Sequence, residues 1–270
     1  MSSLETLKVA YASDLHLDFE DINPSFFDVE ADVLVLAGDT AEWKNWKHQE
    51  PFFAACSKKF PLVIVIAGNH EFYHGNLPSD YIKMKEFASQ FSNVHFLQNE
   101  TLEVKGWTFI CATLWTDINK GDPISRHVVG TGMNDYHIIR QSDNGYRKLD
   151  TFRTMREHMR SKNFILEELA KGKPSIVVSH HAPCSLSINE FYRADHHMNQ
   201  GYYSDLTPIM FGYPNLKGWF HGHVHNRPHS YAIEQCVVYT NTRGYPGETT
   251  TAIRNSFVPQ VAEFSGENSG

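Results

Sequence analysis

Two apolar runs of β-branched residues constrain the fold of this chain more than any other feature. Asp32–Ala37 and Leu62–Ala67 consist almost entirely of Val, Leu, Ile and Ala. Continuous runs of this kind are typical of strands covered on both faces, whereas strands with one wet face alternate polar and apolar residues. Helices are predicted beside these runs, at Pro51–Lys59 and Ser79–Phe91. The sequence therefore predicts an α/β protein.

Further elements are predicted along the rest of the chain from short β-branched or aromatic runs and from helical periodicity. The strands are Leu7–Ser13, Val94–Leu97, Thr101–Val104, Trp107–Thr113, Ser175–Ser179, Gly218–Phe220, Tyr231–Ile233 and Val237–Thr240. A long amphipathic helix is predicted at Arg147–Lys171, with a buried side formed by Phe152, Met155, Met159, Leu166 and Leu169.

Two segments lack a periodic pattern. Residues 116–146 are rich in Gly, Asp and Asn, and an irregular stretch of this length inside a compact domain is usually functional or disordered. We predict an irregular insertion there. Residues 263–270 are polar and are predicted to form a flexible tail. No repeat or low-complexity linker divides the remainder, so residues 1–262 are predicted to form a single domain.

Polar clusters follow five of the predicted strands at the point where each strand ends. The clusters are Asp14-Leu15-His16, Gly38-Asp39, Gly68-Asn69-His70-Glu71, His180-His181-Ala182-Pro183 and His221-Gly222-His223-Val224-His225. Ligands of open α/β sheets bind beyond the carboxyl ends of the strands. Five separate segments are therefore expected to deliver Asp, His and Asn side chains to one edge.

The residue types in these clusters indicate a metal centre. Imidazole and carboxylate groups without a thiolate cluster suit Zn, Fe, Mn or Ni, and a carboxylate can bridge two ions about 3.5–4 Å apart. Gly38 and Gly68 allow the backbone to turn sharply near an ion. Taken singly, Asp14 or Asp39 could be a helix N-cap, Asn69 a turn residue, and the histidines core or surface residues. The convergence of all five clusters favours the metal centre.

Composition narrows the class of protein. The chain of 270 residues contains 16 His, a high count for the commonest metal ligand. Its formal net charge of −7 disfavours binding to duplex nucleic acid. No apolar run approaches the roughly 20 residues of a membrane span, no secretory signal is visible, and the four Cys lie far apart. We therefore expect a reduced, cytoplasmic protein with no membrane partner.

The series DLH, GD, GNHE, SHHAP and GHVH, in this order, resembles the calcineurin-like metallophosphoesterase superfamily, and the match runs from Asp14 to His225. The resemblance implies a sandwich of two mixed β-sheets flanked by helices, with two divalent transition-metal ions (Mn²⁺, Fe²⁺/Fe³⁺, Zn²⁺ or Ni²⁺) at the strand ends. It implies one metal held by Asp14, His16 and His225, a second held by Asn69, His180 and His223, and Asp39 bridging them. A metal-bridging hydroxide would attack phosphorus in line. His70 would contact the phosphoryl oxygens or protonate the leaving group.

Departures from the superfamily motifs indicate which branch of the superfamily the chain resembles. Phosphoprotein phosphatases of the superfamily continue the first two motifs as DxHG and GDxxDRG, whose arginine grips the phosphate. Here Leu17 follows His16, and Thr40-Ala41-Glu42-Trp43 follows Asp39. The pattern is closer to the small-molecule and phosphodiester branch. Among the neighbours of the motifs, Glu71 is expected to orient a ligand histidine, and His181 and His221 are expected to have supporting roles.

A finer resemblance links the chain to a group of bacterial and phage phosphoesterases. It covers Leu114-Trp115-Thr116-Asp117, Met133-Asn134-Asp135-Tyr136, Arg140, Tyr203-Ser204-Asp205-Leu206 and Asn241-Thr242-Arg243-Gly244-Tyr245. Several of these segments lie in or beside residues 116–146, which are therefore expected to form the substrate lid. Residues 140–173 contain nine Lys/Arg and five Asp/Glu, and Arg140 and His158 are predicted as substrate-side residues.

The sequence thus predicts a metal-dependent phosphoester hydrolase, and within that class a phosphodiesterase acting on a small or nucleotide-like substrate. Two alternatives remain. A nuclease on single-stranded nucleic acid is compatible with the positive segment 140–173. A catalytically inactive scaffold that binds metal is opposed by the presence of all five motifs.

Overall fold

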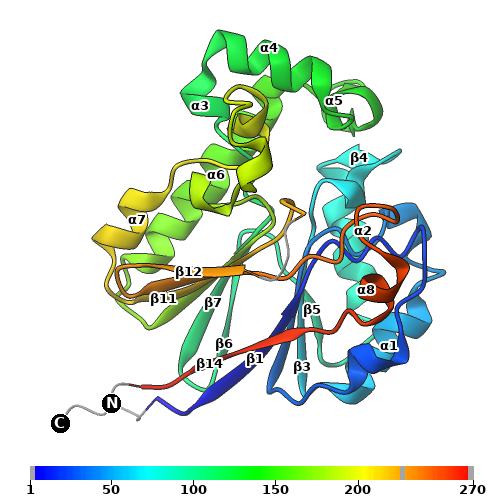
Figure 1. Ribbon diagram of the computed structural model, residues 1–270, viewed down its shortest axis with the longest axis vertical. Helices are drawn as coiled ribbons and strands as arrows, with labels where there is room; N and C mark the ends of the chain where they lie inside the picture. Colours follow the sequence, from blue (N-terminus) through cyan, green and yellow to red (C-terminus); the bar gives the residue numbers. More distant parts are fainter. Residues whose placement is uncertain (1–3, 226–228, 267–270) are drawn as a thin grey trace.

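The computed structural model describes residues 4–225 and 229–266, and two large mixed sheets dominate it (Figure 1). The first has the order β14 (Gln260–Phe264), β1 (Leu7–Ala12), β2 (Val33–Ala37), β3 (Leu62–Ile66) and β5 (Val94–Phe96). The second has the order β12 (His229–Ile233), β13 (Cys236–Thr240), β11 (Leu216–His221), β10 (Ser175–Ser179), β7 (Trp107–Ala112) and β6 (Glu100–Val104). A small sheet contains β4 (Asn76–Leu77), β8 (Arg140–Gln141) and β9 (Arg147–Lys148).

Alternation along β2 shows how the layers are built. Val33 and Val35 point into the apolar cluster between the two large sheets, where they join Phe109 and Val178 of the second sheet. The intervening Leu34 and Leu36 belong to a cluster on the outer face. Both faces of β2 are therefore buried, as its uninterrupted apolar sequence predicts.

Helices cover the outer face of each large sheet. The helices α1 (Glu50–Lys59) and α2 (Ser79–Ala88) supply Phe53 and Met84 to the cluster on the first sheet. On the second sheet, α6 (Thr151–Leu169) and α7 (Thr207–Gly212) supply Ile165 and Met210 to a further cluster. The result is a layered arrangement of helices, sheet, sheet and helices. This confirms the predicted sandwich.

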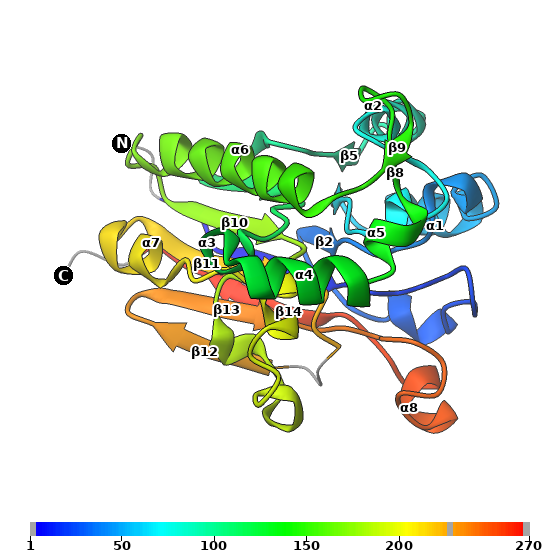
Figure 2. The same ribbon diagram turned by 90° about the horizontal axis from the view of Figure 1, so that it is seen from above.

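Residues 118–138 form a helical cap instead of the irregular insertion expected there. The cap contains α3 (Ile118–Gly121), α4 (Pro123–Gly132) and α5 (Asp135–Ile138). It lies over the upper ends of the sheets (Figures 1 and 2). Asp122 caps α4 by accepting from the Ser125 backbone N–H, and Pro123 occupies a first-turn position that suits proline. These local features outweigh the Gly-rich composition.

Two further expectations need correction. Glu263 and Phe264 belong to β14, where they pair with Lys8 and Leu7, so the ordered sheet extends into the predicted tail. Helix α6 buries only part of its predicted apolar side: Leu169 is buried and Met155 and Leu166 are partly buried, whereas Phe152 and Met159 are 64% and 51% exposed. Its buried residues include Arg153, Glu157 and His158, and the Arg153 guanidinium pairs with the carboxylates of Glu157 and Asp143.

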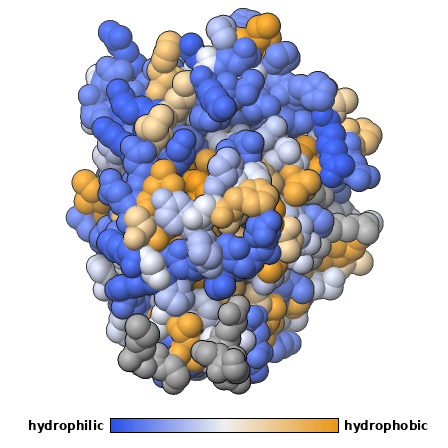
Figure 3. Space-filling view, turned by 90° about the vertical axis from the view of Figure 1, so that its left-hand side faces the viewer, coloured by the Kyte–Doolittle hydropathy of each residue, from blue (hydrophilic) through white to orange (hydrophobic). Residues whose placement is uncertain are grey.

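The remaining elements are short helices in the loops. They are α8 (Thr251–Asn255) and the 3₁₀ helices η1 (Pro24–Phe27), η2 (Trp43–Asn45), η3 (His70–Phe72), η4 (Ser185–Ser187), η5 (Glu190–Tyr192) and η6 (Met198–Gly201). The face shown in Figure 3 mixes apolar and polar side chains. None of the helices in the described ranges has the length and apolarity that a membrane span requires.

Candidate metal centre

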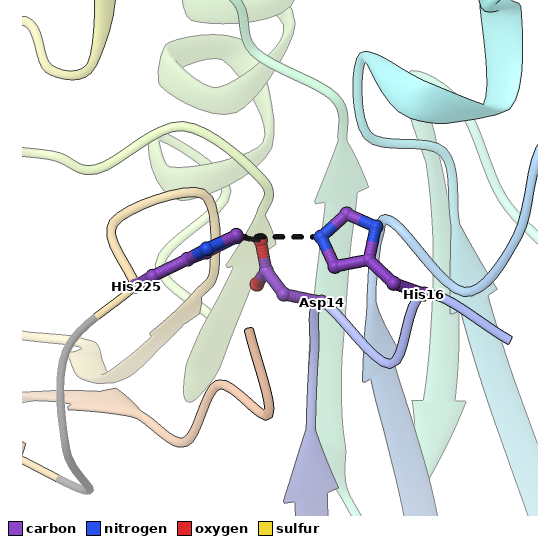
Figure 4. A group of neighbouring side chains, drawn as sticks. All are labelled: Asp14, His16 and His225. Carbon is purple, nitrogen blue, oxygen red and sulfur yellow. Dashed lines mark hydrogen bonds and ion pairs between the residues drawn. The ribbon is translucent and has the colours of Figure 1, made fainter. Parts of the chain in front are cut away.

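The first group of potential metal ligands comprises Asp14, His16 and His225, whose ligand atoms all lie within 4.8 Å of one another. Asp14 and His16 follow β1, and His225 follows β11. The Nε2 atom of His225 is 3.1 Å from Asp14 Oδ1 and 3.3 Å from His16 Nε2. Figure 4 shows these three side chains converging on one point. Three residues predicted to share one metal therefore do lie together.

The second group comprises Asp39, His180 and His223, again within 4.8 Å. Asn69 joins them, because its Oδ1 lies 3.0 Å from His180 Nε2. These residues come from the ends of β2, β3, β10 and β11. All four are buried.

Asp39 lies between the two groups. Its Oδ2 is 3.4 Å from His180 Nε2 in the second group and 4.0 Å from His16 Nε2 in the first. One carboxylate thus faces ligand nitrogens of both groups, which is the geometry that a bridging ligand requires.

The backbone at the strand ends is bent to bring these ligands together. Asp14, His16, Asp39 and His223 all have positive φ values, between 47° and 66°, although residues with a Cβ seldom adopt this region. A Cβ on Gly68 would collide with the Asp39 carboxylate and the His180 ring. The close approach of Asp39 and His180 explains why residue 68 is a glycine. Positive φ values at residues with a Cβ are backbone strain of a kind typical of functional sites.

Hydrogen bonds fix which ring nitrogen faces the centre in two of the ligand histidines. His180 Nδ1 donates to the Ala37 carbonyl at 2.9 Å, and His225 Nδ1 donates to Glu248 Oε2 at 2.7 Å. Each bond leaves Nε2 facing the ligand groups. Glu248 therefore orients a histidine, a role that the sequence suggested for Glu71. Twenty-three residues separate Glu248 from His225, so no local pattern revealed the pair.

Glu71 has a different role from the one expected. Its carboxylate is fully buried and accepts the backbone N–H groups of Gly68, Asp39 and Thr40 at 2.6, 3.0 and 2.8 Å. It therefore joins the loops that follow β2 and β3, and among the described residues no hydrogen bond links it to a ligand ring. Burial and the neighbouring Asp39 carboxylate raise the pKa of Glu71 to about 8.

The donor set fits a pair of metal ions. The Nε2 atom of His223 is buried and has no hydrogen-bond partner among the described residues, and such an atom is costly unless something coordinates it. Burial and the neighbouring His181 and His180 hold the pKa of His223 well below its usual value. The ring is thus in the neutral form that binds metal.

His70 lies beside both groups. Its ring nitrogen falls within 4.8 Å of ligand atoms of His16 and Asp39, and its backbone N–H donates to Asp39 Oδ1 at 2.9 Å. The ring stacks on Tyr73 with centroids 3.8 Å apart, and Nε2 contacts the Tyr245 hydroxyl. Tyr245 was noticed in the sequence only as part of a motif.

His181 and His221 lie outside both groups. The His181 ring packs 4.3 Å from the His223 ring, and its Nδ1 is 3.3 Å from the Thr113 carbonyl oxygen. His221 Nε2 is 2.8 Å from Ser187 Oγ. These contacts agree with the supporting roles expected for the two residues.

A cavity of about 680 Å³ lies between the ligand groups and the cap. On the side of the ligand groups, the cavity is lined by Asp39, His70 and His223. On the side of the cap, it is lined by Met133 and Asp135. Its walls carry four tyrosines: Tyr73, Tyr192, Tyr202 and Tyr245.

The two residues predicted to contact substrate do not line this cavity. Arg140 is exposed and donates to the Tyr146 carbonyl. His158 is buried on α6, with Nδ1 3.3 Å from the Trp115 carbonyl oxygen. The positive charge of residues 140–173 does not reach the cavity lining, and Arg153, Lys171 and Lys173 of this segment form ion pairs within the chain.

Comparison with known proteins agrees with this arrangement. The calcineurin-like phosphoesterase family matches residues 7–227. An uncharacterized protein of Acanthamoeba polyphaga mimivirus is 31% identical over an alignment of 274 positions, which spans 92% of this chain and 93% of the relative.

Solved structures share the fold at low sequence identity. The phosphopantetheinyl hydrolase of Mycobacterium tuberculosis superposes with a TM-score of 0.64 at 18% identity, covering 88% of this chain and 90% of that one. A Thermus thermophilus protein superposes with a TM-score of 0.55 at 12% identity, covering 97% of this chain and 99% of that one.

The extent of the family match, the four-layer sandwich and the grouped Asp and His ligands lead to one conclusion. The chain belongs to the calcineurin-like phosphoesterase family and is a metal-dependent phosphoester hydrolase.

Proposed function

We propose that this hydrolase cleaves phosphodiesters of small or nucleotide-like molecules with the help of two divalent transition-metal ions. One ion would be held by Asp14, His16 and His225, and the other by Asn69, His180 and His223, with Asp39 shared. The observation that carries the proposal is the position of Asp39, whose Oδ2 faces His180 on one side and His16 on the other.

The chemistry divides between the ions and the chain. When bound, the ions would supply Lewis acidity and an activated water nucleophile. His70 is the group of the chain best placed to contact a phosphoryl oxygen or protonate the leaving oxygen, because it lines the cavity beside Asp39. Tyr73 and Tyr245 hold its ring in place.

The cavity favours a diester over a monoester. Among the described residues that line it, none is Lys or Arg. A phosphate monoester carries a charge of about −1.5 to −2 near neutral pH, and phosphoprotein phosphatases use an arginine to grip it. A diester carries a single negative charge, which a metal pair can balance without that arginine.

The lack of Lys and Arg among the described residues that line the cavity also gives less support to a nuclease. An oligonucleotide would need several cationic side chains along its backbone, and the positive segment 140–173 contributes none to the described cavity lining. Arg153 of that segment is buried in ion pairs with Asp143 and Glu157. A scaffold that binds metal would need the same grouped ligands, so the observation that favours an enzyme is the position of His70 in the cavity beside Asp39.

The proposal also covers the domain organisation of the chain and the cellular location of the protein. We infer that residues 1–262 act as one domain, with residues 116–146 as the substrate lid, because Gly132, Met133 and Asp135 line the cavity. We also infer a cytoplasmic location, because all four cysteines are buried and free.

The test is a substrate panel with separate metals. The metal-stripped chain is reloaded with Mn²⁺, Fe²⁺, Zn²⁺ or Ni²⁺ and offered bis(p-nitrophenyl) phosphate, p-nitrophenyl phosphate, cyclic nucleotides and a single-stranded oligonucleotide. We expect the small diesters to react fastest, the Asp39→Asn variant to lose the activity, and Asp28→Asn, the same change at an exposed position, to keep it. Faster monoester hydrolysis would contradict the diester proposal, and stoichiometric metal binding without any turnover would favour the scaffold.

A further inference from the structure

The cap contacts the second ligand group through one buried carboxylate. Asp135, the first residue of α5, is 2% exposed. Its Oδ1 accepts from Asn69 Nδ2 at 2.8 Å and from the Tyr73 hydroxyl at 2.9 Å. Sixty-six residues separate Asp135 from Asn69. This bond therefore joins the cap to the loop that follows β3.

The bond determines which way the Asn69 amide points. A carboxylate only accepts hydrogen bonds, so the NH₂ group of Asn69 has to face Asp135. Its oxygen then lies on the opposite side, 3.0 Å from His180 Nε2. The Tyr73 hydroxyl, 3.5 Å from Asn69 Nδ2, reinforces the same orientation from the β3 side.

We propose that Asp135 is a positioning residue that turns the Asn69 oxygen toward Asp39, His180 and His223, so that binding of a divalent cation there depends on the docked cap. Without Asp135, the long contact with the Tyr73 hydroxyl holds the amide less firmly, and the amide can turn its NH₂ group toward the cation position, where a donor opposes a positive charge. Within residues 4–225 and 229–266, no hydrogen bond or ion pair joins Asp135 to the first ligand group, Asp14, His16 and His225. The first ligand group should therefore keep its affinity for a divalent cation when Asp135 is replaced. The inference rests on the proposed pair of metals.

Metal titration of the stripped chain tests this without relying on activity. The parent chain is expected to bind two Mn²⁺ in isothermal titration calorimetry. Asp135→Ala should weaken one site roughly 10–100-fold, the usual effect of losing an outer partner of a ligand, and leave the other unchanged. Asp135→Asn keeps an acceptor oxygen and should restore most of the affinity. Asp195→Ala serves as the matched control, because Asp195 lines the same cavity but bonds the Met198 backbone.

A reciprocal exchange keeps the inference testable even where Asp135→Ala does not fold. Asn69→Asp alone makes two carboxylates face each other and should weaken the second site. In the double variant Asn69→Asp/Asp135→Asn, the new amide at position 135 donates to the new carboxylate at position 69. Metal affinity at the second site should then recover.

The possible results separate this inference from the proposed function. A parent chain that binds two Mn²⁺ and hydrolyses diesters, beside an Asp135→Ala variant with both affinities unchanged, overturns the role of Asp135 alone. Equal weakening of both sites, or an exchange variant no better than Asn69→Asp, overturns it as well. A parent chain that binds fewer than two Mn²⁺ contradicts the proposed function and this inference with it.

Discussion

Replacement of Glu71 tests how the chain holds the loops that carry its ligands. The Glu71 carboxylate accepts three backbone N–H groups, two on Oε2 from Gly68 and Asp39 and one on Oε1 from Thr40. The residue is fully buried. Glu71→Ala removes the acceptor for all three donors at once.

The magnitude follows from the number of donors. A buried N–H group left without an acceptor costs about 1–3 kcal/mol, and water entering the vacated space would recover part of that cost. We therefore expect Glu71→Ala to lower the free energy of unfolding by about 3–6 kcal/mol. Glu71→Gln keeps one oxygen for two donors and opposes the third with its NH₂ group, so the expected loss is about 1–3 kcal/mol.

Urea denaturation of the metal-free chain, followed by circular dichroism, measures this loss without the contribution of bound ions. Glu86→Ala, the same kind of truncation at an exposed position of α2, should change the stability by less than about 0.5 kcal/mol. A loss below about 1 kcal/mol for Glu71→Ala, or equal losses for the Ala and Gln variants, would refute the reasoning.

Three other substitutions have distinct expected outcomes. Glu248→Ala removes the acceptor of His225 Nδ1 and should weaken Mn²⁺ binding at one site roughly 10–100-fold in calorimetry; unchanged affinity would contradict that role. Tyr245→Phe keeps the ring stacked on His16 but loses the hydroxyl contact with His70, so kcat for a diester should fall about tenfold, corresponding to one hydrogen bond of about 1.4 kcal/mol, with both metals still bound. Arg153→Met leaves the buried Glu157 with the exposed Arg160 as its one remaining ion-pair partner among the described residues, and thermal or urea unfolding should reveal a loss of about 3 kcal/mol.

Much of the sheet architecture could be predicted because it depends on local patterns. The runs at β2 and β3 are apolar on both faces, and the structure buries both faces of each strand. The ligand residues directly follow strands whose carboxyl ends meet at one edge. Their positions after the strands were therefore sufficient to predict that Asp14, His16, Asp39 and Asn69 lie at one edge of the sheets.

The contacts that support the ligands could not be predicted in this way. The pairs Glu248–His225 and Asp135–Asn69 join segments 23 and 66 residues apart, and their spacing depends on the folded loops. The buried side of helix α6 was predicted only in part, because Arg153, which a hydrophobic pattern places in solvent, is buried and paired with Asp143 and Glu157. The helices of residues 118–138 could not be predicted from composition. They depend on N-capping side chains such as that of Asp122.

The most direct test of the central claim is a titration of diesterase activity against bound metal. Mn²⁺ is added stepwise to the stripped chain, bound metal is measured by elemental analysis, and hydrolysis of bis(p-nitrophenyl) phosphate is followed at each step. If Asp39 joins two ligand groups into one active centre, activity reaches its plateau at two Mn²⁺ per chain and is absent from the Asp39→Asn variant. Full activity in the stripped chain, or a plateau at one Mn²⁺ per chain, would contradict the account.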